Sequence, residues 1–131
     1  MNPKYSTALA TLVAGLVAGS VLLLPLQAAD AKKDVIKDVM KTYHKAPEGQ
    51  DPVCKKASEG KATPDQLKQL VAAYESMAKA KPPKGDEASW KEKTAKLVAA
   101  AKALQKGEAD GAAKYKDAVG CKGCHMAHKP D

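Results

Sequence analysis

Apolar side chains recur every three or four positions through most of the chain, which is the spacing of one face of an α-helix. In the first such stretch, about residues 31–46, lysines and aspartates occupy the opposite face. Its apolar positions are Val35, Ile36, Val39, Met40 and Tyr43. Pro47, Gly49 and Pro52 follow and end the pattern. The pattern therefore predicts a first amphipathic helix over about residues 31–46.

A second helix is marked by its start signal as well as by its apolar face. In the stretch TPDQ, Thr63 and Gln66 have the spacing of a capping box, and Pro64 occupies the first helical position. Leucines, valine, tyrosine and methionine then recur on one face until Pro82-Pro83. We therefore expect a helix from Thr63 to the residues just before Pro82.

The same signals predict three more elements: a helix from Asp86 or Ser89 to Gly107, a helix from about Asp110 that continues into residues 121–125, and a short helical turn between Asp51 and Gly60. No stretch shows the alternation that is typical of a β-strand. Short loops between helices of similar length favour antiparallel neighbours. The expected fold is all-α, an antiparallel (up-down-up-down) four-helix bundle.

The first 31 residues have the layout of a secretory signal peptide. Lys4 precedes an apolar segment at residues 8–24, and small residues that suit cleavage follow Pro25, best at Ala-Asp-Ala 29–31. The apolar segment is shorter than the roughly 20 residues that span a bilayer. We expect cleavage, export to the periplasm and one mature domain at residues 32–131, with retention as a membrane anchor as the alternative.

Charge and composition indicate which kinds of molecule the chain can bind. The formal net charge is +7, and every one of the 22 basic residues is a lysine. Nucleic-acid-binding proteins rely on arginine for bidentate contacts, so we expect no nucleic-acid partner. Lysines spread along helices form either a solvated surface or a docking surface for an acidic protein. The chain has no phenylalanine, and its thin core would gain from a large apolar prosthetic group.

The chain ends in VGCKGCHMAHKPD (119–131), which contains the pattern C-x-x-C-H. Residues three apart lie on the same side of a helix, so the thiols of Cys121 and Cys124 can add to the two vinyl groups at one haem edge. His125 follows directly and can bind the iron through Nε2 as the proximal ligand. In an exported helical protein this motif indicates one covalently bound haem c.

Two other chemistries are compatible with these residues. A zinc site would use Cys121, Cys124, His125 and His128, but a histidine directly after the second cysteine leaves too little chain to close a tetrahedron. A thioredoxin-like dithiol expects a βαβ context, which the helical pattern does not provide. The remaining cysteine, Cys54, is expected to be a small buried hydrophobe. An intermolecular disulfide, giving a homodimer in place of a monomer, is the alternative.

A single C-x-x-C-H at the end of the last helix of a four-helix bundle resembles the class II c-type cytochromes, the cytochrome c′ superfamily. The resemblance covers the mature chain as an architecture, and its one sharp motif is residues 121–125. It implies a haem at one end of the bundle and a role in electron transfer or gas binding. Because the chain has no arginine, tuning of gas binding by a distal arginine does not carry over.

In that family the residue on the distal face of the haem comes from the first helix, which here implies Met40. Met–His ligation gives a haem of raised potential that suits the transfer of single electrons. His44, four residues on, is the alternative distal ligand, and a purely core role for Met40 is a further alternative. Met126 and His128 follow His125 too closely to reach the opposite face, so we expect His128 on the surface or beside a haem propionate.

These expectations combine into a periplasmic one-electron carrier that is not an enzyme. A peroxidase would need a distal acid–base pair beside an open site, for which His44 alone is available. The alternative is a five-coordinate haem protein that binds NO or CO, with Met40 guarding the distal side. The expected partners are redox proteins, acidic ones among them.

Overall fold

The computed structural model describes residues 27–130, with side chains from residue 35 onward, and every regular element in that part is a helix. The helices are α1 (Gln27–Tyr43), α2 (Val53–Ser58), α3 (Pro64–Lys79), α4 (Glu87–Gln105), α5 (Gly111–Ala118) and α6 (Cys121–His128). The all-α prediction is confirmed for the described residues. The helix expected over about residues 31–46 ends at Tyr43, and the expected short turn is α2.

The start of α3 follows from local sequence chemistry. The hydroxyl of Thr63 accepts a hydrogen bond from the N–H of Gln66 at 3.2 Å, and the Gln66 side chain accepts one from the N–H of Thr63 at 3.0 Å. The predicted capping box is therefore confirmed, with Pro64 as the first helical residue. Asp86 and Ser89 were the two candidates for the N-cap of α4. The carboxylate of Asp86 accepts a hydrogen bond from the N–H of Ser89 at 2.7 Å, so Asp86 is the N-cap.

The single last helix expected from Asp110 into the cysteine motif is wrong, because two helices occupy this stretch. Helix α5 ends where the N–H of Val119 donates to the carbonyl oxygen of Tyr115 at 2.9 Å. Gly120 then caps α6, and its backbone does not continue the helix. Glycine is a poor helix former, so the chain turns there. The break gives the motif its own short helix.

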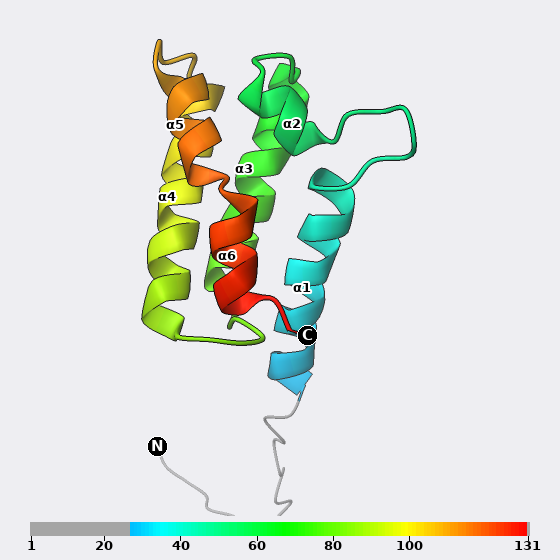
Figure 1. Cartoon of the computed structure of the whole chain (residues 1–131), viewed down its shortest axis with the longest axis vertical. Coiled ribbons are helices and arrows are strands. Elements are labelled where there is room, and N and C mark those ends of the chain that lie inside the picture. The colour runs from blue at the N-terminus through cyan, green and yellow to red at the C-terminus, as the bar shows by residue number, and fades with distance from the viewer. Residues whose placement is uncertain (1–26, 131) are drawn as a thin grey trace, which may run out of the picture.

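The long helices α3 and α4 pack along each other and form the centre of the molecule, with α1 against α3, and α5 and α6 against α4. In Figure 1, α6 is drawn between α4 and α1, in front of α3. The buried core comes from five of these helices, α1 to α5: Val39; Ala57; Leu70, Val71, Tyr74 and Met77; Trp90, Leu97, Ala100 and Ala101; Tyr115. Alanines on α4 allow close approach, which suits a chain without phenylalanine.

None of the described helices is long and apolar enough to cross a bilayer. The predicted signal peptide, including its apolar segment at 8–24, lies outside the described residues except for its last five positions, which belong to α1. The expectations of cleavage or anchoring therefore stay predictions.

Candidate haem-attachment site

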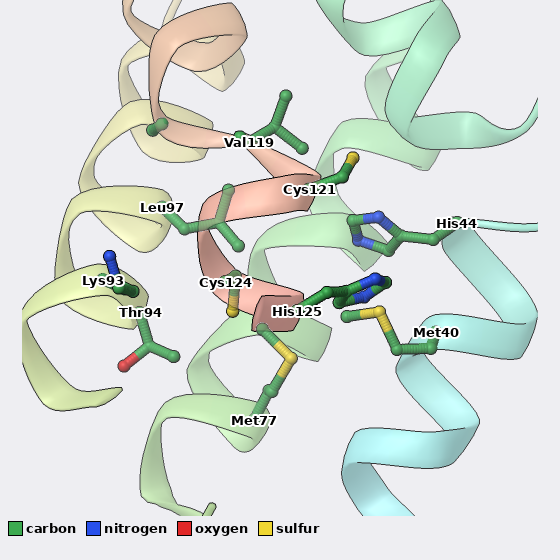
Figure 2. Close-up of a pocket in the computed structure, with 12 residues that line it drawn as sticks. Met40, His44, Met77, Lys93, Thr94, Leu97, Val119, Cys121, Cys124 and His125 are labelled. Carbon is green, nitrogen blue, oxygen red and sulfur yellow. The ribbon is translucent and has the colours of Figure 1, made fainter. Parts of the chain in front are cut away.

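The residues of the C-x-x-C-H motif open helix α6. The N–H of Cys124 donates to the carbonyl oxygen of Gly120 at 3.3 Å, which starts the first turn. In Figure 2 the His125 ring projects from α6 towards α1, and the thiol of Cys124 points towards Met77 on α3. The thiol of Cys121 points in a different direction, but this residue is exposed, so other rotamers are open to it.

Two cavities adjoin the motif, and Met40, Cys124 and His125 line both of them. The smaller holds about 40 Å³ and is also lined by Cys121 and His44. The larger holds about 460 Å³, which is within the range of about 300–1,000 Å³ that is typical of small-molecule sites. The motif therefore meets the first helix at a space of suitable size.

The larger cavity combines apolar walls with exposed positive charge. Ile36, Met40, Pro83 and Trp90 contribute the apolar lining. Four exposed lysines also line it: Lys37, Lys41, Lys45 and Lys129. None of these lysines forms an ion pair with another described residue. The larger cavity therefore combines an apolar wall with a positively charged rim.

Both candidate distal ligands line the smaller cavity, and Met40 also lines the larger one. Met40 is half-buried, and His44 lies directly after the end of α1. The N–H of His44 donates to the carbonyl oxygen of Met40 at 3.2 Å, which continues the helical pattern by one residue. Burial lowers the pKa of His44 to about 4, and the nearby charge of His125 lowers it further in the same direction. The His44 imidazole is therefore neutral at pH 7.

The sequence did not reveal that His44 is hydrogen-bonded to a buried pair of tyrosines. The Tyr74 hydroxyl lies 3.0 Å from Nε2 of His44 and 2.6 Å from the Tyr115 hydroxyl. Both tyrosines are fully buried, and burial raises the pKa of each phenol well above its usual value. The one available signal was that buried tyrosine hydroxyls need partners. Sequence spacing does not say which partners they find.

Of the two placements expected for His128, the one on the surface is wrong, because this side chain is 2% exposed; the one beside a haem propionate stays a prediction. Its Nδ1 donates to the carbonyl oxygen of Lys84 at 3.0 Å, and its Nε2 lies 3.2 Å from the Ser89 hydroxyl. Its ring also packs edge-on against Trp90, with 5.3 Å between centroids. His128 is buried because the last turn of α6 packs against the loop between α3 and α4.

This placement bears on the zinc alternative. Both ring nitrogens of His128 are engaged with Lys84 and Ser89, which removes it from a ligand set with the two cysteines. Among the side chains that the structure describes, residues 35–130, no group of three or more histidine, cysteine or acidic side chains is arranged to hold a metal ion. The smaller cavity still brings together two thiols, two imidazoles and two thioethers, which belong to Cys121, Cys124, His44, His125, Met40 and Met77.

Cys54 lies on α2 and is half-buried, so the expectation of full burial is only partly met. Burial raises the pKa of its thiol, and the nearby thiol of Cys121 acts in the same direction. Burial likewise raises the pKa of Cys124, with Lys93 acting against it. No disulfide joins any two of the three cysteines, all of which lie among the described residues.

Comparison with known proteins assigns no family to this arrangement. The chain matches no protein-family model, and neither a curated protein nor a solved structure matches it. The function must therefore be argued from the site itself.

Proposed function

We propose that the chain is an exported c-type cytochrome that carries one covalent haem and passes single electrons, with the four-helix-bundle architecture of the cytochrome c′ superfamily. The mature domain would be residues 32–131, left in the periplasm after removal of the signal peptide. The observation that carries the proposal is the shared cavity. Cys124 and His125 of the C-x-x-C-H motif and Met40 of α1 line the same space.

Each residue has a defined part in this proposal. The thiols of Cys121 and Cys124 would form the two thioether links, and His125 would be the proximal iron ligand. Met40 is the proposed distal ligand, since it lies on α1 opposite the motif and lines both cavities. Haem c, when bound, supplies an iron that cycles between ferric and ferrous states, and Met–His ligation raises its potential.

The charge around the cavity supports an acidic edge on whatever occupies it. Lys37 and Lys41 lie one turn apart on α1, Lys45 follows the end of that helix, and Lys129 directly follows α6. Haem propionates would find counter-charges there. The same uncompensated charge would attract an acidic redox partner and speed its encounter in a salt-dependent way. The apolar walls would exclude water from the iron.

The test is to produce the full chain in a host that matures c-type cytochromes. We expect coloured protein whose pigment stays on the chain through acid–acetone extraction, with a mass increase of one haem. The Cys121→Ala/Cys124→Ala double variant should lose the covalent pigment, whereas the matched control Cys54→Ala should keep it. Colourless wild-type protein, or pigment that is extracted freely, would refute the proposal.

The spectrum of the same protein separates a carrier from a gas-binding protein. A six-coordinate, low-spin ferrous form that binds CO slowly supports the carrier. Met40→Leu should then become high-spin and bind CO rapidly. Rapid CO uptake by the wild type would instead identify a five-coordinate haem and overturn the electron-carrier assignment.

A further inference from the structure

Three side chains from separate elements form a continuous hydrogen-bonded row that ends at the candidate site. Tyr115 of α5 meets Tyr74 of α3 at 2.6 Å between hydroxyl oxygens, and Tyr74 meets Nε2 of His44 at 3.0 Å. The tyrosine rings are stacked at 6.3 Å, and the His44 ring is tilted against Tyr74 at 5.7 Å. The row connects the interior of the fold to the distal side of the cavity.

The direction of these hydrogen bonds follows from counting donors. Each tyrosine hydroxyl has one hydrogen to donate. If Tyr115 donates to Tyr74 and Tyr74 donates to His44, both hydrogens are used. In the reverse direction the Tyr115 hydrogen would have no acceptor among the described residues, and Tyr115 is 0% exposed. An unsatisfied buried donor is unfavourable. The row therefore runs from Tyr115 through Tyr74 to His44, and the lone pair of Nε2 is occupied.

An imidazole nitrogen binds a metal through that same lone pair. His44 lines the smaller cavity together with Met40 and His125, so it competes with Met40 for the iron. Its side chain has the Tyr74 hydroxyl as its hydrogen-bond partner. To reach the iron through Nε2, His44 would have to abandon a buried hydroxyl and leave it without an acceptor. Met40 has no such contact to break.

We propose that Tyr74 is a positioning residue whose hydroxyl holds His44 away from the sixth coordination position and leaves that position to Met40. This proposal rests on the proposed haem function. It predicts that the identity of the distal ligand is set by one phenolic hydroxyl on α3, outside the cavity lining itself.

The experiment is Tyr74→Phe in the haem-loaded full chain, which keeps the buried ring and removes only the hydroxyl. We expect loss of the thioether-to-iron charge-transfer band of the ferric protein, an electron paramagnetic resonance spectrum of bis-histidine type, and a fall in reduction potential. Adding His44→Gln to Tyr74→Phe should restore the Met–His spectrum. Tyr115→Phe is the matched control: it leaves the Tyr74 hydroxyl in place and should keep Met–His ligation.

The outcomes distinguish this proposal from the one on which it rests. Covalently pigmented Tyr74→Phe with an unchanged Met–His spectrum overturns the positioning role and leaves the cytochrome function intact. A bis-histidine or five-coordinate wild type also overturns it. Absence of covalent haem in the wild type refutes the cytochrome function instead. Should Tyr74→Phe not fold, nitrogen NMR of the ferrous wild type decides. We expect His44 to carry its hydrogen on Nδ1, and a hydrogen on Nε2 would overturn the proposal.

Discussion

Replacing His128 by alanine should loosen the helix that carries the C-x-x-C-H motif. α6 has eight residues, and isolated helices of that length are unstable in water. Its tertiary contacts are mainly with α4. His128 is the one buried side chain of α6, so its contacts contribute much of what holds the helix to the fold.

The magnitude follows from three contacts. The hydrogen bonds to Lys84 and Ser89 are worth about 1 kcal/mol each. We use this net value because Lys84 is exposed and Ser89 is half-buried, so water can reach the groups left behind. The edge-on contact with Trp90 at an interplanar angle of 73° adds about 0.5–1.5 kcal/mol. His128→Ala should therefore cost about 2–4 kcal/mol.

Two further variants separate the contributions. His128→Phe keeps a ring against Trp90 and loses both hydrogen bonds, so it should cost about 2 kcal/mol. Met126→Ala is the control on the same helix, since Met126 is 74% exposed and surface changes stay within about 0.5 kcal/mol.

The assay is urea unfolding of the haem-loaded chain, followed by circular dichroism and by the fluorescence of Trp90, the chain's one tryptophan. Amide hydrogen exchange in residues 121–128 detects local opening of α6 that a global transition would miss. If His128→Ala matched Met126→Ala in both the unfolding midpoint and the exchange rates, the contacts of His128 would not be what holds α6 to the fold.

Two more predictions follow from the structure. Cys54 should be the one titratable thiol of the unfolded haem-loaded chain, and in the folded chain it should react slowly with iodoacetamide at pH 8. Burial raises the pKa of the Cys54 thiol above its usual 9.0, so at pH 8 a smaller fraction of it is the reactive thiolate than in an exposed cysteine. Three titratable thiols after unfolding, or fast alkylation of the folded chain, would contradict this prediction. Gly85→Ala should cost about 1–3 kcal/mol more in unfolding free energy than Gly49→Ala. Both glycines have positive φ (82° and 80°). A Cβ at Gly85 would meet the Ala127 carbonyl oxygen and His128, whereas one at Gly49 meets nothing within 4 Å. Equal costs would show that α6 does not pack closely against the loop that contains Gly85.

Much of the fold was predictable because its signals are local. The capping box at Thr63 and the apolar stripe of the first helix act within a few residues, and both predict their helices correctly. The break between α5 and α6 was missed because the apolar pattern runs on through Ala118 and Val119. A single glycine, Gly120, outweighs that pattern.

The candidate site likewise has a part that the sequence predicts and a part that it does not. The spacing of Cys121, Cys124 and His125 is a local property, so the sequence alone identifies these residues as a possible haem attachment. The contacts that position the site are not local. Tyr74 lies 30 residues from His44 and 41 from Tyr115, and His128 lies 39 residues from Ser89. Only the packing of helices decides such pairs, and their residue types are ordinary core and surface residues.

The two histidines of the tail show what this long-range packing adds. His125 and His128 are three residues apart, so they lie near the same side of α6, yet one is exposed beside the cavity and the other is buried under a loop. A helix turns by about 100° per residue, so a slip of one residue would move His125 away from α1. By fixing the His128 ring at two atoms and against Trp90, the fold fixes the rotation of α6 about its own axis. The second histidine thus determines where the first one points.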